Sequence, residues 1–278
     1  MTPQSRYLTC AGRELHVTEW GSGHADVVVA WHGLARTGRD MDHIAALLAQ
    51  RWRVICPDTL GRGYSQWSPV PADEYCLDFY ERQAVSLLDQ LGVRDCLWLG
   101  TSMGGAIGLR AAVGGLRGRI HRLVLNDIGP ELAAPAVDRI LSYAGSPPAF
   151  ATMLELKQYF RTVYKPYGWL SDAMWRTLTE SSMRRLPDGR VTPHYDPAMV
   201  QQFVHHPDDY LQWDAWDALS IPVLCLRGET SDLLLPDVAD AMRTRGPRAL
   251  VATIPGCGHA PALNVPEQTA LVERFLAA

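Results

Sequence analysis

The segment Cys96–Gly104, with the sequence C-L-W-L-G-T-S-M-G, carries the strongest structural signal in the chain. Its apolar first half predicts a buried strand, and Met103–Val113 after it has the apolar spacing of a helix. Ser102 stands in the turn between them, with a glycine two residues before it and two after it. Side chains at those two positions would clash in so sharp a turn. The segment therefore predicts a nucleophile elbow, which exposes the serine Oγ above the sheet and directs a helix N-terminus at any oxyanion formed there.

Strand and helix patterns alternate on both sides of this turn. Short apolar runs at Asp26–Ala30, Arg53–Pro57 and Arg122–Asn126 predict three more buried strands. Amphipathic patterns predict helices over Asp40–Gln50 and Tyr75–Leu91. This alternation predicts an α/β fold, with a mostly parallel sheet covered by helices on both faces.

The two ends of the chain extend the sheet. Ser5–Thr9 and Glu14–Trp20 predict an antiparallel hairpin at one edge. The runs Pro222–Leu226 and Ala249–Ile254 predict two further strands, and Pro266–Leu276 predicts a closing amphipathic helix.

The alternation is interrupted between residues 130 and 214. This segment is rich in proline and has no run typical of a buried strand, and its clearest helical patterns cover residues 150–164 and 171–185. We expect residues 130–214 to form an inserted helical cap on a core made of residues 1–129 and 215–278.

Composition narrows the class of protein. A net charge of -4 with scattered basic residues gives no reason to expect nucleic acid or an anionic membrane as a partner. The six cysteines include no C-x-x-C pair, and the N-terminus lacks the charged start and apolar run of a signal peptide. We expect a reduced, cytoplasmic protein that acts on a small-molecule substrate; the oligomeric state is left open.

A serine nucleophile requires a base and an acid that orients it. His259 follows the last expected strand, so its loop leaves the same sheet edge as Ser102, and glycines flank it closely. Asp232 follows Pro222–Leu226 and gives the chain order Ser, Asp, His. Asp127, directly after Arg122–Asn126, would leave the same edge and is the alternative; we favour Asp232.

Two backbone N–H groups should form the oxyanion hole. Met103 supplies one as the residue after the nucleophile, and Leu34, in the loop after Asp26–Ala30, supplies the other. The neighbouring His32 is expected to order this loop by hydrogen bonding rather than to catalyse.

The sequence gives no sign of a cofactor. His205-His206 with Asp208-Asp209 could suggest a metal site, but adjacent side chains point in different directions and no further ligand cluster completes it. The glycines near Ser102 do not form G-x-G-x-x-G, and no Walker sequence is present. We expect no metal and no cofactor.

Together these motifs resemble the α/β-hydrolase superfamily. The resemblance rests on His32-Gly33-Leu34, the P-D-x-x-G-x-G-x-S sequence at Pro57–Ser65, the elbow, Gly228…Asp232 and Gly258-His259, and it extends over nearly all of the chain outside the cap. It implies an eight-stranded sheet and a Ser-His-Asp triad, and the Pro57–Ser65 sequence would order the loop beside the oxyanion hole. One departure is Trp31, where members usually carry a smaller aliphatic residue.

The resemblance also limits the reaction. Dehalogenases and epoxide hydrolases carry Asp at the elbow, so Ser102 argues against both. We expect hydrolysis of a small or medium carboxylic ester or lactone with an apolar portion, through an acyl-enzyme. The main alternative is a carbon–carbon bond hydrolase of meta-cleavage keto acids, whose carboxylate Arg184 and Arg185 could meet. A cofactor-free perhydrolase and a non-catalytic ligand-binding receptor are further alternatives.

Aromatic residues are concentrated in the expected cap, which suits an apolar acyl or alcohol group as well as simple packing. Trp169 and Trp175 in the cap, with Trp31 beside the oxyanion loop, are the candidate substrate-binding residues.

Overall fold

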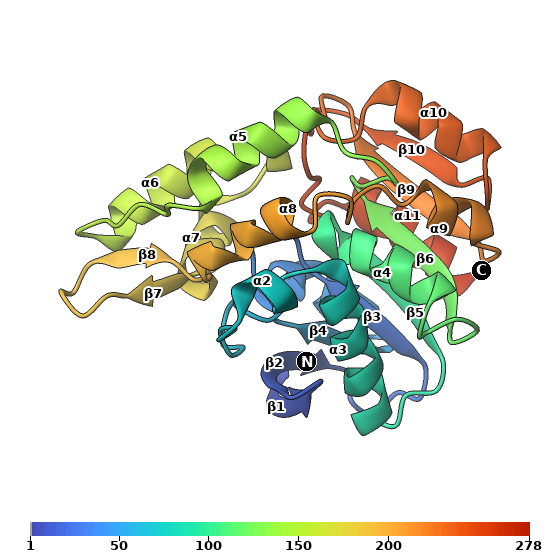
Figure 1. Cartoon of the computed structure of the whole chain (residues 1–278), viewed down its shortest axis with the longest axis horizontal. Helices are drawn as coiled ribbons and strands as arrows, with labels where there is room; N and C mark the ends of the chain where they lie inside the picture. The colour runs from blue at the N-terminus through green and yellow to red at the C-terminus, as the bar shows by residue number, and fades with distance from the viewer. Residues whose placement is uncertain (1) are drawn as a thin grey trace.

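In the computed structural model, which describes residues 2–278, eight strands form one sheet in the order β1-β2-β4-β3-β5-β6-β9-β10 (Figure 1). β1 and β2 pair antiparallel, as do β2 and β4, and all other neighbours are parallel. The strands are β1 (Gln4–Cys10), β2 (Arg13–Trp20), β3 (Val27–Trp31), β4 (Arg53–Pro57), β5 (Cys96–Thr101), β6 (Ile120–Asn126), β9 (Val223–Gly228) and β10 (Leu250–Ile254). The predicted α/β architecture, with its edge hairpin and its mostly parallel eight-stranded sheet, is confirmed.

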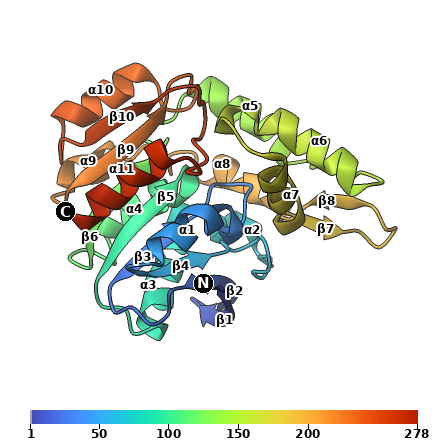
Figure 2. The same ribbon diagram turned by 180° about the vertical axis from the view of Figure 1, so that it is seen from behind.

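Helices cover both faces of this sheet. The face in front in Figure 1 carries α3 (Leu77–Gln90) and α4 (Met103–Val113), whereas α1 (Asp42–Leu48) and α11 (Pro266–Ala277) lie in front in Figure 2, which is seen from behind. Shorter or peripheral elements of the core are η1 (Gly38–Met41), α2 (Pro71–Glu74), α9 (Trp213–Ala218) and α10 (Pro236–Thr244).

Strand β3 shows why the sheet is buried on both faces. Val27, Val29 and Trp31 pack into the apolar cluster under α3 and α4, and Val28 and Ala30 pack into the cluster under α1 and α11. All five side chains are at most 5% exposed, as expected for an uninterrupted apolar run in a parallel sheet.

Residues 130–214 contain none of the eight strands and lie to one side of the sheet (Figure 1). An apolar cluster of this segment's own holds it together, and its buried members are Leu156, Phe160, Tyr164, Trp175 and Val191. The elements are α5 (Ala134–Ala144), α6 (Met153–Val163), η2 (Lys165–Tyr167), α7 (Asp172–Ser181), β7 (Met183–Arg185), β8 (Val191–Pro193), η3 (Pro197–Gln201) and α8 (Gln202–His205).

This segment differs from the sequence prediction in one respect. The helix expected over 171–185 ends at Ser181, and the chain then forms the antiparallel hairpin β7–β8. A Pro187-Asp188-Gly189 turn joins the two strands, with φ of +87° at the glycine. Proline fixes the first turn position and glycine supplies the left-handed one, so this tripeptide was a readable turn signal.

Candidate active site

Ser102 lies in a strained turn between β5 and α4. Its backbone has φ 51° and ψ −120°, a conformation that L-residues rarely adopt. A Cβ at Gly100 would lie 2.3 Å from the backbone of Gly104, and one at Gly104 would lie 2.3 Å from the Trp31 carbonyl oxygen. Both glycines are therefore required by close backbone approach, as the G-x-S-x-G pattern predicts.

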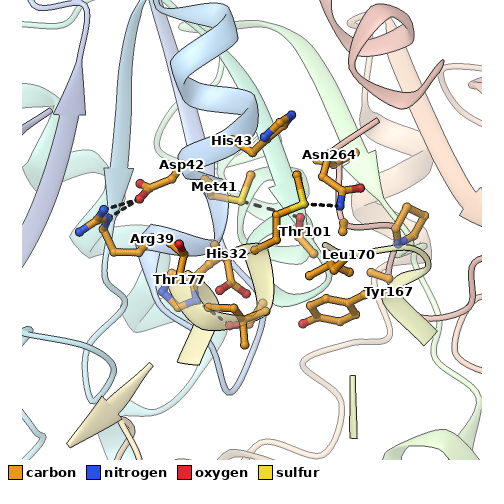
Figure 3. A pocket seen from close by; sticks show the side chains of 18 of the residues that line it. His32, Arg39, Met41, Asp42, His43, Thr101, Tyr167, Leu170, Thr177 and Asn264 are labelled. Atoms are coloured by element: carbon orange, nitrogen blue, oxygen red, sulfur yellow. Dashed lines mark hydrogen bonds and ion pairs between the residues drawn. The ribbon is translucent and has the colours of Figure 1, made fainter. Parts of the chain in front are cut away.

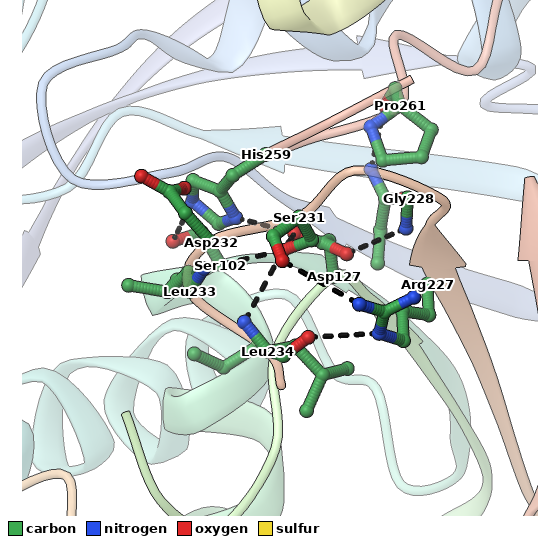
Figure 4. Close-up of polar contacts among 12 residues, drawn as sticks. Ser102, Asp127, Arg227, Gly228, Ser231, Asp232, Leu233, Leu234, His259 and Pro261 are labelled. Carbon is green, nitrogen blue, oxygen red and sulfur yellow. Dashed lines mark hydrogen bonds and ion pairs between the residues drawn. The ribbon is translucent and has the colours of Figure 1, made fainter. Parts of the chain in front are cut away.

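A continuous chain of hydrogen bonds links Ser102, His259 and Asp127 (Figure 4). His259 Nε2 lies 2.9 Å from Ser102 Oγ, and His259 Nδ1 lies 2.7 Å from Asp127 Oδ2. The three residues leave the carboxyl ends of β5, β6 and β10, which meet at one edge of the sheet. This is the connectivity in which a carboxylate fixes the imidazole tautomer and the free nitrogen accepts the serine proton.

Asp127 is built into its place by the neighbouring strand. Its carboxylate is inaccessible to solvent and accepts hydrogen bonds from the Gly228 N–H at 2.7 Å and the Ser231 hydroxyl at 2.6 Å. Its own N–H donates to the Leu226 carbonyl at 2.7 Å. Two donors from the β9 loop therefore hold both carboxylate oxygens, one of which also receives His259.

The predicted preference for Asp232 over Asp127 is wrong, because Asp127 and not Asp232 contacts His259. Asp232 is half exposed and forms a surface ion pair with Arg139, with an Oδ2–Nε distance of 2.7 Å. The loop after β9 directs Ser231 inward, to Asp127, and the next residue, Asp232, outward. The expectation located the correct loop but assigned the wrong contribution to it, because the loop supplies hydrogen-bond donors to Asp127 rather than the carboxylate that contacts His259.

The two predicted oxyanion donors lie beside Ser102. A Cβ placed on Gly33, next to Leu34, would be 3.6 Å from Ser102 Cβ. Within residues 2–278 the N–H groups of Leu34 and Met103 donate to no other group, which leaves both free for a ligand. Arg62 is fully buried and donates from Nε to the Leu34 carbonyl at 2.8 Å, so it holds the peptide that follows Leu34 and ties this loop to Pro57–Ser65. Arg62 belongs to the Pro57–Ser65 motif, and this contact is one structural role of that motif.

His32 orders the same loop, in agreement with the sequence interpretation. Its Nδ1 donates to the Gly33 carbonyl at 2.6 Å, and its Nε2 accepts from the Thr59 N–H at 2.9 Å. Complete burial lowers the pKa of His32 to about 4, so the ring is neutral at pH 7. A neutral imidazole with both nitrogens occupied has no proton to exchange with a substrate.

Two cavities lie close to the Ser102–His259 pair: Thr101 and Ala260 border one, and His259 borders the other. One, of about 330 Å³, is mostly apolar and lies between the loops at Gly33 and Ala260 and helix α7, which contributes Met174, Thr177 and Leu178 (Figure 3). The other, of about 660 Å³, is bounded by His259 and by Lys165 near the end of α6.

The three predicted substrate-binding tryptophans border neither cavity. Trp31 is inaccessible, stacks on Trp98 with ring centroids 5.3 Å apart and donates to Thr59, so it fills core. Trp175 packs inside the apolar cluster of residues 130–214, and Trp169 is 67% exposed on the surface. These assignments are corrections. Sequence gave no signal for the α7 residues that border the smaller cavity instead.

The other sequence candidates have ordinary partners. Arg184 stacks on the Trp67 ring, with 5.0 Å from Cζ to the centroid. His206 Nε2 donates to the Ala72 carbonyl at 2.8 Å. Over residues 2–278 no group of three or more His, Cys, Asp or Glu side chains is arranged to hold a metal ion. No helix in the described part of the chain is long and apolar enough to cross a bilayer.

Comparison with known proteins agrees with the fold. The model of the alpha/beta hydrolase family matches residues 27–271. The chain is 37% identical to a 3-hydroxybutyrate-oligomer hydrolase of Cupriavidus necator over 92% of this chain and 90% of that one. It is 26% identical to a 2-hydroxymuconate semialdehyde hydrolase of Pseudomonas putida, over 98% and 94%. A crystal structure of an alpha/beta hydrolase from Novosphingobium aromaticivorans superposes with a TM-score of 0.87 at 32% identity, covering 100% of this chain and 99% of that one.

Proposed function

Because the chain belongs to the alpha/beta hydrolase family, we propose that it hydrolyses carboxylic esters through an acyl-enzyme on Ser102. The observation that supports this most directly is the hydrogen-bonded series Ser102–His259–Asp127, with distances of 2.9 and 2.7 Å. His259 borders one cavity, and Thr101, the residue before Ser102, borders a second. Residues 130–214 act as a cap that encloses the substrate above it.

In the first half of the reaction, Ser102 Oγ attacks the ester carbonyl carbon while His259 Nε2 takes its proton. The N–H groups of Leu34 and Met103 stabilise the negative charge that develops on the carbonyl oxygen. His259 then donates the proton to the departing alkoxide, and the alcohol leaves.

In the second half, water attacks the acyl-enzyme and gives up a proton to the same imidazole nitrogen. Asp127 stays ionised throughout, holds the Nδ1–H tautomer and stabilises the imidazolium. The products are a carboxylic acid and an alcohol, and Ser102 is regenerated.

For the substrate, we propose a small or medium ester with an apolar portion, and short 3-hydroxybutyrate oligomers as the first compounds to examine. The similarity to the Cupriavidus necator oligomer hydrolase supports an ester bond as the target. The apolar lining of the 330 Å³ cavity, with Met174 and Leu178, suits a short branched acyl or alkyl group.

A second candidate is carbon–carbon bond hydrolysis of a vinylogous keto acid. It is supported by the similarity to the Pseudomonas putida 2-hydroxymuconate semialdehyde hydrolase. The same three side chains would serve that reaction, so they do not discriminate between the two.

The test is initial-rate activity on p-nitrophenyl esters of increasing acyl length, on a linear 3-hydroxybutyrate dimer and on a ring-cleavage keto acid, with Ser102→Ala as the blank. Ester turnover with an optimum chain length supports the esterase and sizes the acyl site. Rapid bleaching of the keto acid without ester turnover assigns the second candidate.

A further inference from the structure

The two cavities close to Ser102 and His259 differ in the charges that border them. The apolar cavity of about 330 Å³ is bordered by one arginine, Arg39, and by two carboxylates, those of Asp40 and Asp42. Arg39 is already paired with Asp42 at 2.5 Å. A negatively charged portion of a substrate would meet two carboxylates and an occupied cation there, which is unfavourable.

The cavity of about 660 Å³ has the opposite balance. Its charged residues are Arg139, Lys165 and Asp232, and His259 also borders it. Arg139 and Asp232 form an ion pair at 2.7 Å, so their charges offset each other. Lys165 therefore gives this cavity one excess positive charge, and a carboxylate is the complementary group for it.

Lys165 has no partner of its own within residues 2–278. The chain contains two lysines, and the other one, Lys157 in α6, pairs with Asp172 at 3.2 Å. Lys165 forms no such pair in the described part of the chain. It is exposed and it borders the cavity, so its ammonium group is accessible to a ligand.

The main chain holds Lys165 next to His259. Pro166 directly follows Lys165, and its carbonyl accepts a hydrogen bond from the Gly258 N–H at 2.7 Å. A Cβ placed on Gly258 would be 3.0 Å from Pro166 Cβ. Since Gly258 directly precedes His259, the two segments lie side by side, and a ligand bound by Lys165 would lie beside the imidazole.

The proposed reaction decides which portion of an ester lies there. His259 Nε2 donates its proton to the departing alkoxide oxygen, so the alcohol portion must lie within reach of that nitrogen. The apolar cavity, bordered by Gly33 and Thr101, would then receive the acyl portion. The alcohol portion thus faces the cavity that has the excess positive charge.

We infer that Lys165 is a specificity-determining residue that binds a carboxylate on the alcohol portion of the substrate. The inference rests on the proposed ester hydrolysis and adds a substrate class, namely esters whose leaving alcohol is a hydroxy acid with a free carboxyl group. The linear 3-hydroxybutyrate dimer is such an ester, and water cleaves it into two molecules of 3-hydroxybutyrate. In longer oligomers the same contact selects the ester bond nearest the free carboxyl end.

Three esters separate the possibilities. The first is the linear 3-hydroxybutyrate dimer with its free carboxylate. The second is the terminal amide of that dimer, which has nearly the same size and no charge. The third is the mono-sec-butyl ester of succinic acid, whose carboxylate lies on the acyl portion. Chromatography of the released acids gives kcat and KM for each.

The variants change the charge at one position at a time. Lys165→Met removes the charge and keeps the length of the side chain, whereas Lys165→Arg keeps the charge. Lys157→Met is the matched control, because Lys157 is the other lysine of the same segment and does not border the cavity. Its partner Asp172 is largely exposed, so loss of that pair should hardly affect stability.

We expect the wild type to have a kcat/KM about 5- to 30-fold higher for the free-acid dimer than for its amide, the value of a charge-assisted hydrogen bond from an exposed ammonium. The difference should appear in KM, because the carboxylate is bound equally in the ground state and the transition state. Lys165→Met should abolish the preference and leave the amide within about twofold. Lys165→Arg and Lys157→Met should both keep it.

The other outcomes count against the inference. Ester turnover without this preference in the wild type, or a Lys165→Met enzyme that keeps it, makes Lys165 a hydrated surface charge and leaves the proposed function intact. Equal losses on the acid and the amide in Lys165→Met indicate a structural role. A preference for the succinate monoester that Lys165→Met removes places the carboxylate on the acyl portion and contradicts the orientation. If the wild type cleaves none of the three esters, the proposed function itself fails.

Discussion

Replacement of Asp127 by asparagine tests the geometry of the site most sharply. The carboxylate has three donors around it: His259 Nδ1–H, the Gly228 N–H and the Ser231 hydroxyl. An amide has one oxygen and one NH₂ group, so it cannot accept from all three. If its oxygen faces Gly228, its NH₂ faces His259, whose Nδ1 must then be the acceptor. Nε2 then carries the proton and cannot take one from Ser102.

The alternative orientation of the amide is no better. It would set the NH₂ group against the Gly228 N–H, donor to donor. Ser231 Oγ cannot relieve the problem by accepting, because the N–H groups of Leu233 and Leu234 already donate to it at 3.3 and 3.2 Å. We therefore expect kcat to fall by about 10,000-fold, the cost of the wrong tautomer, and stability to fall by about 1–3 kcal/mol.

The assay is the initial rate on the best p-nitrophenyl ester, with urea unfolding to confirm that the variant is folded. Asp232→Asn is the matched control, because it makes the same chemical change in the half-exposed pair with Arg139. Such pairs contribute about 0–1 kcal/mol, so the control should keep at least about one third of the activity. A larger loss in Asp232→Asn than in Asp127→Asn, or an Asp127→Asn enzyme within tenfold of the wild type, would refute the reasoning.

Three further predictions concern other parts of the site. Ser102→Ala should lower turnover at least about 1,000-fold, and a burst experiment should find no acyl-enzyme; a normal rate would disprove nucleophilic catalysis by this residue. The pKa of His32 is about 4 in the folded protein and 6.5 in the unfolded chain. As the pH falls from 6.5 to 4, only the unfolded chain binds this proton, so the free energy of unfolding should fall by about 3 kcal/mol. Urea titrations of His32→Asn should show a shallower loss over the same window, and parallel curves would contradict the assignment. Gly104→Ala puts a Cβ 2.3 Å from the Trp31 carbonyl and should cost about 1–3 kcal/mol and most of the activity, whereas Gly23→Ala, which has open space, should cost neither.

Sequence alone was sufficient for the sheet and for two of the three hydrogen-bonded residues. The hydrophobic period of a segment, the length of an apolar run and the residues of a turn are local properties of the sequence. The strands and the Ser102 elbow depend on them. His259 followed from the rule that loops after parallel strands share one edge.

The acid could not be chosen in that way, since Asp127 and Asp232 both follow strands that end at this edge. What separates them is the direction in which each side chain leaves its loop, which depends on the positive φ of 56° at Asp127 and on contacts from Gly228 and Ser231. Those contacts join residues about a hundred positions apart, so they produce no repeating pattern in the sequence.

The tryptophan predictions failed for a related reason. Aromatic composition indicates that large side chains are present, but not whether they face a cavity, each other or solvent. Trp31 lies in the core of the sheet, Trp175 lies inside the apolar cluster of residues 130–214, and Trp169 lies on the open surface.

The two points where the chain leaves the core after β6 and returns before α9 lie against each other: the Gln212 N–H donates to the Pro130 carbonyl at 2.7 Å. Because the closure entropy of a loop grows only by about 0.6 kcal/mol for each doubling of its length, a segment with adjacent ends can change in length at little cost to the core. Ser102, Asp127 and His259 all lie outside it. The junction between Pro130 and Gln212 is therefore a suitable point at which to exchange the segment. Segments from relatives could be exchanged between residues 130 and 212 while the hydrogen-bonded series Ser102–His259–Asp127 is kept, which under the proposed function would alter the choice of substrate.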